Sequence, residues 1–145
     1  MDFPIMVIRP FENADENEVV DLWARCGLIR PWNDPHKDIA RKCRLQRELF
    51  LVGAIDGVIA ATVMAGYDGH RGWINYLAVD PAQRRRGFGR ALMNEAERLL
   101  QELGCPKINL QVRRENLEAM AFYRRTGFAE DAVASFGKRL ERDDG

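Results

Sequence analysis

Four arginines and two glycines are concentrated in residues 84–90, RRRGFGR, where a strand pattern gives way to a helix pattern. The free N–H groups of a first helical turn carry partial positive charge, so cations beside them are unfavourable unless an anion binds there too. Glycines let the backbone approach that anion closely. The stretch therefore predicts a phosphate-binding loop, with a solvated basic loop as the alternative. Its members are Arg84, Arg85, Arg86, Gly87, Phe88, Gly89 and Arg90.

A strand and a helix flank this loop in the order that phosphate binding requires. Residues 73–80, WINYLAVD, are apolar on both alternating faces apart from Asn75, which is typical of a strand covered on both sides. Apolar residues then recur at helical spacing as far as Leu103, and Gly104 and Pro106 end the helix. A helix that begins after such a loop points its amides at a bound phosphate.

Two common phosphate loops do not fit this spacing. A P-loop has Lys-Ser or Lys-Thr after its second glycine, where this chain has Arg90 and Ala91. A dinucleotide fingerprint that began at Gly87 would need Gly or Ala where this chain has Leu92. The remaining pattern is R-x-x-G-x-G over residues 84–89.

A second motif follows a second strand pattern, KINLQVR at residues 107–113. Residues 116–128, NLEAMAFYRRTGF, read N-x-x-A-x-x-x-Y followed by G-F. These residues also have local interpretations, because Asn116 fits a helix N-cap, Tyr123 an amphipathic core position and Gly127 a C-cap. Together, however, the two motifs resemble the GNAT superfamily of N-acetyltransferases, which use acetyl-coenzyme A.

The resemblance covers nearly the whole chain and implies a fold and a reaction. The fold is α/β (α+β), with a central, mixed, mostly antiparallel twisted sheet of six to seven strands flanked by about four helices, in a single domain over residues 1–145. The reaction is transfer of an acetyl group from acetyl-coenzyme A to a primary amine of a small molecule or peptide, by direct attack in a ternary complex and without a metal. A homodimer is one of the oligomeric states that the resemblance leaves open. WNDP at residues 32–35 and YDGHRG at residues 67–72 are also similar to the small bacterial YpeA-type members.

The resemblance assigns roles on the coenzyme side of the site. Backbone amides of residues 85–90 hold the pyrophosphate at the start of the helix. Backbone groups of Leu77 and Val79 hold the pantetheine arm, and Asn116 contacts the same arm. Tyr123 donates a proton or a hydrogen bond to the departing thiolate.

The acceptor side is less completely assigned. Many members of the superfamily carry a glutamate on the central strand, where this chain has Asn75 as its interior polar residue. Asp68 and His70 are the nearest titratable candidates for a general base, with an exposed loop histidine as the alternative. Trp32 and Asn33 are candidates for the lining of the amine site, unless WNDP only joins two helices.

Composition limits the remaining possibilities. The chain has 145 residues, with 22 Lys plus Arg and 22 Asp plus Glu, so its formal net charge of zero provides no general attraction for nucleic acid. The longest apolar run, Gly57–Gly66, is about half the length of a membrane helix, and we expect a soluble cytoplasmic protein. The three cysteines have no CxxC spacing, so neither disulfides nor zinc are expected.

Periodicity and turn signals predict the other elements. Asp34-Pro35 provides an N-cap and a first-turn proline for a helix that runs to about Gln46, whose basic face we interpret as solvated. Asp56-Gly57 is a two-residue hairpin turn. The other expectations are a strand at 5–9, a helix at 15–25, strands at 49–55 and 58–67, one or two closing strands at 129–140 and a polar tail at 141–145.

Three functional hypotheses remain open. The favoured one is a small N-acetyltransferase. Gln111 counts against one activity of this kind, because some N-terminal amine acetyltransferases of ribosomal proteins carry a glutamate there. The second is a non-catalytic acyl-coenzyme A binding or regulatory module, which the missing strand glutamate permits and Tyr123 disfavours. The third is a nucleotide-binding domain of another kind, which Leu92 and the missing Lys-Ser disfavour.

Overall fold

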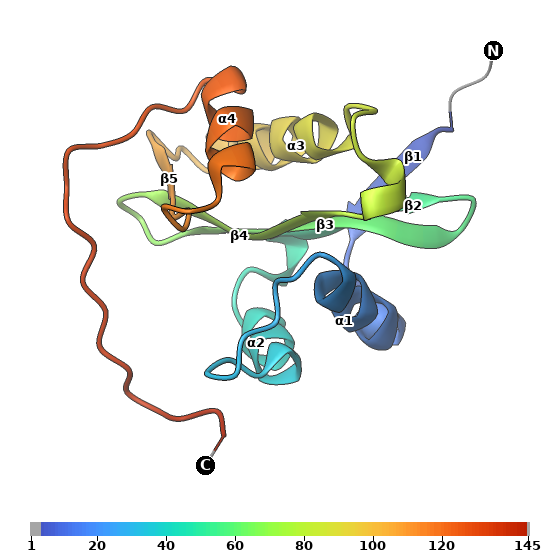
Figure 1. Ribbon diagram of the computed structural model, residues 1–145, viewed down its shortest axis with the longest axis horizontal. Coiled ribbons are helices and arrows are strands. Elements are labelled where there is room, and N and C mark those ends of the chain that lie inside the picture. The colour runs from blue at the N-terminus through green and yellow to red at the C-terminus, as the bar shows by residue number, and fades with distance from the viewer. Residues whose placement is uncertain (1–3, 145) are drawn as a thin grey trace.

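The computed structural model describes residues 4–144, which contain one five-stranded sheet in the order β1-β2-β3-β4-β5 (Figure 1). The strands are β1 (Met6–Pro10), β2 (Phe50–Ile55), β3 (Val58–Tyr67), β4 (Gly72–Val79) and β5 (Ile108–Leu110). Neighbours are antiparallel except for β4 and β5, which are parallel. A mixed, mostly antiparallel sheet is therefore confirmed. The expected six to seven strands are wrong, since five occur within residues 4–144.

Four α-helices cover the two faces of the sheet. They are α1 (Glu16–Arg25), α2 (Pro35–Lys42), α3 (Phe88–Glu102) and α4 (Leu117–Arg125). Figure 1 shows α1 and α2 on one face and α3 and α4 on the other. One hydrophobic cluster joins Trp23 of α1 to Phe50 of β2, and a second joins Leu92 and Leu100 of α3 to Val63 of β3. The sheet is thus buried on both faces, as the apolar pattern of its central strands requires.

The hairpin of β2 and β3 turns at the predicted dipeptide. Asp56 and Gly57 have φ values of 52° and 79°, the left-handed pair that a two-residue type I′ turn requires. β2 is buried at every position, so this hairpin forms the centre of the sheet.

Helix α2 begins as predicted but ends early. The Asp34 carboxylate accepts the N–H of His36 at 2.9 Å, and Pro35 occupies the first turn. The helix ends at Lys42 instead of about Gln46, because Gln46 adopts a left-handed conformation with φ 54°. The Gln46 side-chain amide pairs with the backbone of Tyr67 in both directions, at 2.9 and 2.8 Å. This pairing holds the chain against β3 and stops the helix.

The closing strands expected at residues 129–140 are another correction. Residues 129–144, the C-terminal strap, follow β5 without pairing with its backbone and then run toward α2 (Figure 1). The contacts with the β5 region are made by side chains: Asp131 binds Lys107 at 2.9 Å, and Ser135 accepts a hydrogen bond from Gln111. Such contacts keep the backbones farther apart than the roughly 4.8 Å of a strand ladder. Accordingly, 95% of Phe136 stays exposed.

The end of the strap is fixed to α2, although its sequence predicts only a polar tail. Asp143 is 7% exposed, and its carboxylate binds the Arg41 guanidinium at 2.6 Å and the Asp34 N–H at 2.8 Å. The Lys37 ammonium donates to the Asp143 carbonyl at 2.6 Å. The basic face of α2 is therefore partly covered, because its cations bind the other end of the chain.

Candidate functional site

The outer edge of β4 is only partly covered by β5. The strand expected at residues 107–113 forms at Ile108–Leu110 only, and it pairs with the first three residues of β4. The Asp80 N–H donates to the Ala60 carbonyl at 2.7 Å, which in an antiparallel ladder turns the N–H and C=O of Val79 away from β3. Residues 75–79 therefore form a free edge of β4, with no strand beside it in the described chain.

A β-bulge at Tyr76 shapes this free edge. Tyr76 and Leu77 together lie opposite the single β3 residue Val63, and Tyr76 is left-handed with φ 51°. The Tyr76 hydroxyl donates to the Asp38 carboxylate at 2.6 Å, and its ring stacks on Trp23 with 3.8 Å between centroids. Burial and the Asp38 carboxylate raise the pKa of Tyr76, so the phenol remains a donor and helps to hold the bulge.

The loop after β4 presents uncapped amides at the start of α3. Gly87 is the N-cap residue, with φ 81° and no side chain, and Arg85 is also left-handed with φ 65°. Helix geometry leaves the first-turn N–H groups of Phe88, Gly89 and Arg90 without intrahelical acceptors. A helix start of this kind is a binding site for an anion such as phosphate.

Most of the arginines in this loop have structural contacts. Three donate to neighbouring oxygens: Arg84 to the Val79 carbonyl at 3.2 Å, Arg86 to the Gln83 side chain at 3.1 Å and Arg90 to the Arg125 carbonyl at 3.2 Å. Arg85 is exposed and makes no hydrogen bond or ion pair with any residue in the range 4–144. Its guanidinium is therefore available to a bound anion.

Helices α3 and α4 meet at the end of the free edge. A Cβ added to Gly89 would lie 3.4 Å from Val79 Cγ2 and 3.4 Å from the Phe122 ring. A glycine at this position thus lets the start of α3 pack closely against the side chains of Val79 on β4 and Phe122 on α4.

Asn116 and Gly127 delimit α4 as their local interpretation predicts. The Asn116 side chain accepts the Ala119 N–H at 3.1 Å, and Gly127 follows the helix with φ 99°. Asn116 is exposed, so its amide nitrogen remains accessible.

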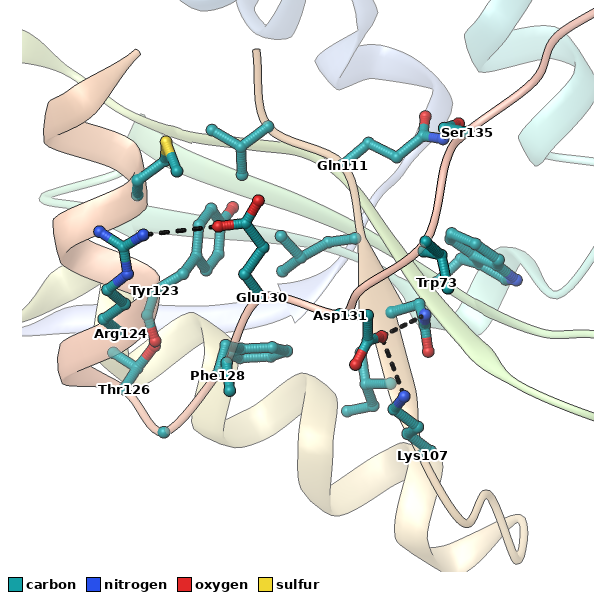
Figure 2. A pocket seen from close by; sticks show the side chains of 18 of the residues that line it. Trp73, Lys107, Gln111, Tyr123, Arg124, Thr126, Phe128, Glu130, Asp131 and Ser135 are labelled. Carbon is teal, nitrogen blue, oxygen red and sulfur yellow. Dashed lines mark hydrogen bonds and ion pairs between the residues drawn. The ribbon is translucent and has the colours of Figure 1, made fainter. Parts of the chain in front are cut away.

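Tyr123 points from α4 into a cavity beside β5 (Figure 2). Its ring has edge-on contacts with Phe122 and Phe128, with centroids 5.2 and 5.6 Å away. Burial raises the pKa of Tyr123 to about 12. No hydrogen-bond partner for its hydroxyl occurs in residues 4–144, so a protonated phenol faces the cavity.

The cavity has a volume of about 1040 Å³ and lies between β5, α4 and the C-terminal strap. It exists because the strap crosses β5 at side-chain distance. Figure 2 shows two acidic side chains of the strap that border it: Glu130, paired with Arg124 at 3.7 Å, and Asp131, which binds Lys107. The opening is large enough for an extended ligand arm.

Trp32 and Asn33 lie where three segments that are far apart in the sequence meet, and each segment contacts the other two. The segments are residues 32–33 of the α1–α2 loop, residues 111–114 after β5 and residues 135–139 of the C-terminal strap, and we call them together the three-segment ring. Its contacts are Arg113 over the Trp32 ring at 5.2 Å, Arg139 to Asn33 at 2.6 Å, and Gln111 to Ser135. The structure thus brings both WNDP residues to the end of β5.

The remaining acceptor-side candidates are not brought together. The Asp68 carboxylate accepts the N–H groups of Arg71 at 2.7 Å and His70 at 2.8 Å, and these bonds lower the pKa of Asp68. Both Asp68 and His70 lie in the β3–β4 turn, at the opposite end of β4 from the α3 loop, and neither lines the cavity. Asn75 lies on the free edge and is exposed.

Sequence reasoning missed three residues that shape this region. Tyr76 looks like one more apolar strand residue, although a phenol in a doubly covered strand signals a buried partner such as Asp38. The sequence around Arg113 and Asp143 does not reveal their roles, because their partners lie about 80 and 100 residues away in the chain. Within residues 4–144 no cluster of His, Cys, Asp and Glu suited to a metal ion occurs, and no helix there is long and apolar enough to cross a membrane.

Comparison with known proteins shows which family the chain resembles. The sequence model described as the acetyltransferase (GNAT) family matches residues 16–128. The chain is similar to Ard1 from Thermoplasma volcanium, with 26% identity, a TM-score of 0.75 and coverage of 88% of this chain and 84% of that one. The chain is also similar to the ribosomal-protein-S18-alanine N-acetyltransferase from Escherichia coli, with 27% identity, a TM-score of 0.74 and coverage of 88% of this chain and 79% of that one.

A third structure resembles the chain in fold. It is the PaiA N-acetyltransferase from Thermoplasma acidophilum in complex with coenzyme A, with 17% identity, a TM-score of 0.78 and coverage of 90% of this chain and 93% of that one. The resemblance drawn from the two sequence motifs is thereby confirmed, while the similarity to YpeA-type members stays a prediction.

Proposed function

The chain belongs to the acetyltransferase (GNAT) family, and from this we propose that it transfers an acetyl group from acetyl-coenzyme A to a primary amine by direct attack in a ternary complex. The observation that carries the proposal is the proximity of three features around Gly89, where α3 packs against Val79 of β4 and Phe122 of α4. The three features are the uncapped start of α3, the free edge of β4 and the unpartnered hydroxyl of Tyr123.

The loop and the free edge fit the two chemically different parts of the coenzyme. The N–H groups of Phe88, Gly89 and Arg90 would bind the pyrophosphate, with the Arg85 guanidinium adding charge. Leu77 and Val79 would offer backbone groups to the amide-containing pantetheine arm, which would run beside β4 as an added strand does. Of the Val79 groups, the N–H is the one available, because the carbonyl already accepts from Arg84.

Tyr123 would act as the proton donor to the leaving thiolate. With a pKa of about 12, its phenol is fully protonated at neutral pH, and no other described residue competes for its proton. A thiolate with an ordinary pKa near 8.5 leaves readily, so this proton is worth a factor of about 10²–10⁴ at most. Loss of the hydroxyl should slow turnover without abolishing it.

Solvent would remove the proton from the amine. The Asp68 carboxylate is bound by two N–H groups and, like His70, lies outside the cavity, so neither is placed to act as the base. An alkylamine with a pKa near 10.4 is mostly protonated at neutral pH. The rate at limiting amine should therefore rise by about tenfold per pH unit up to that pKa, without a break near the histidine value of about 6.5.

A binding and turnover experiment tests the proposal. Acetyl-coenzyme A should raise the melting temperature, and a panel of amines should include one that releases free thiol. Tyr123→Phe should keep the coenzyme affinity and lower kcat by about tenfold or more. Tyr67→Phe is the matched control, because the Tyr67 hydroxyl bonds only the Gly69 carbonyl in the remote β3–β4 turn.

The outcomes separate the hypotheses. A melting-temperature shift with a dinucleotide and none with acetyl-coenzyme A would refute the proposal. Coenzyme binding without thiol release for any amine would support the non-catalytic module. Weakened coenzyme binding in Tyr123→Phe with unchanged kcat would contradict the role given to the phenol.

A further inference from the structure

We propose that the acceptor carries a carboxylate near its amine, and that Arg113 in the three-segment ring recognises it. This inference rests on the proposed function and narrows its acceptor. The ring closes around the end of β5, next to the cavity that contains Tyr123, whose lining includes Gln111, Arg114 and Ser135. An amine that approaches the cavity from this side passes the ring.

The ring is a cationic entrance in a chain of zero net charge. Its segments, residues 32–33, 111–114 and 135–139, contain no Asp or Glu. Their charged residues are Arg113, Arg114, Lys138 and Arg139, and Arg114 also lines the cavity. Four cations with no anion among them favour a negatively charged ligand and repel a polycation.

The acids nearest to the ring in the chain do not pair with Arg113. Asp143 pairs with Arg139 at 3.9 Å, and its carboxylate also binds Arg41 at 2.6 Å and the Asp34 N–H. The Asp34 carboxylate caps α2. Glu115, which follows Arg114 in the chain, is exposed. None of these carboxylates forms an ion pair with Arg113.

The acids that line the cavity lie outside the ring, on α3 and on the part of the strap that precedes residue 135. Glu130 and Asp131 are paired with Arg124 and Lys107, and Glu97 belongs to α3. None of these three acids forms an ion pair with a cation of the ring.

Arg113 is the residue best placed to bind a carboxylate. Its guanidinium lies over the face of Trp32 at 5.2 Å, which restricts its side chain. A guanidinium held over an aromatic face keeps N–H donors at its edge, where a carboxylate can bind two of them. Arg113 makes no ion pair with any residue in 4–144, so these donors are open to a ligand.

Acceptor probes of similar size and different charge test the inference. One set is 4-aminobutyrate, butylamine and putrescine, and the other is the C-terminally amidated tripeptides Ala-Glu-Glu, Ala-Gln-Gln and Ala-Lys-Lys. In at least one set, the acidic member should have a kcat/KM about tenfold above the neutral one and further above the basic one. Added salt should reduce this preference. A preference for a basic member, or rates within twofold across both sets, would overturn the inference.

Arg113→Gln should remove the preference. It should lower kcat/KM for the acidic probe by about tenfold, the size expected for one lost charged hydrogen-bond partner, and leave the neutral probe unchanged. Arg44→Gln, which removes an exposed arginine at the end of α2, is the control for net charge. An equal loss for acidic and neutral probes in Arg113→Gln would show that Arg113 only supports the fold.

A binding measurement separates this inference from the proposed function. Ala-Glu-Glu, added without acetyl-coenzyme A, should shift the NMR signal of the Trp32 indole N–H in the wild type but not in Arg113→Gln. Ala-Lys-Lys should shift it in neither protein. If acetyl-coenzyme A does not bind, the proposed function fails, and this titration still decides whether the ring takes carboxylates. Absence of a shift with Ala-Glu-Glu would refute the inference.

Discussion

The two ends of the site are built in different ways. The proposed coenzyme end consists of consecutive residues from Val79 to Arg90, whose backbone amides and left-handed glycine would form the binding surface. The proposed acceptor end, the three-segment ring, consists of side chains from three parts of the chain joined by three contacts. A backbone site depends on local conformation and tolerates changes in side chains. A ring of side chains can change its ligand through single substitutions, and this suits a family with one donor and many acceptors.

The largest effect is expected from a change in the backbone at the coenzyme end. Gly87→Val places a β-branched residue at φ 81°, which costs a non-glycine residue about 1–2 kcal/mol, and the loop should relax out of its binding conformation. We expect the Kd for acetyl-coenzyme A to rise by more than about tenfold. Isothermal titration calorimetry measures it.

Gly57→Val is the matched control for this strain. Gly57 has nearly the same φ, 79°, in the hairpin turn of β2 and β3, and at both glycines no atom lies within 4 Å of an added Cβ. Both variants should lose similar unfolding free energy, but only Gly87→Val should lose affinity. Equal losses of affinity would show that the loop has no special role.

A smaller effect is expected at the bulge that lies between the two ends. Tyr76→Phe keeps the stack on Trp23 but removes the hydrogen bond to Asp38, leaving a half-buried carboxylate with one donor fewer. We expect a loss of unfolding free energy of about 1–2 kcal/mol in urea titrations. The KM for acetyl-coenzyme A should rise about threefold, because the bulge positions Leu77 on the free edge. An unchanged KM would show that the bulge is held by the backbone alone.

The same contrast explains how much of the molecule could be predicted from its sequence. The α3 loop, the Asn116 cap and the Asp56-Gly57 turn were predictable, because each depends on the conformational preferences of adjacent residues. The closing strands at 129–140 were wrong, because pairing there is decided by long-range contacts of Asp131 and Ser135. The early end of α2 was likewise not predictable, because the Gln46 side chain ends the helix by pairing with β3, which is far away in the sequence.

The candidate site follows the same rule. The proposed pyrophosphate loop and Tyr123 came from two local motifs, and the helices that carry them, α3 and α4, pack together at Gly89 and Phe122. The three-segment ring was only hinted at by Trp32 and Asn33, because its charged members Arg113 and Arg139 are recognisable only when the chain is folded.

The smallest effect is expected at the anchor of the strap. The Arg41 guanidinium and the Asp34 N–H lower the pKa of Asp143 from 3.8 to about 2. A carboxyl whose pKa is depressed in the folded state contributes stability above its unfolded pKa, and this contribution is lost as pH falls through its folded pKa. The urea midpoints of wild type and Asp143→Asn should therefore differ most above about pH 4 and converge near pH 2.

The anchor also tests whether the two ends of the site are independent. Loss of the Asp143 contact should loosen the strap and with it the bond between Arg139 and Asn33. The KM for the acceptor should then rise about twofold to threefold, whereas the Kd for acetyl-coenzyme A should stay within experimental error. Asp144→Asn is the control, because within residues 4–144 Asp144 pairs with the exposed Arg142 alone. If Asp143→Asn weakened coenzyme binding as much as acceptor binding, the two ends would be one cooperative unit, since a side-chain anchor near α2 would then control the backbone loop of α3.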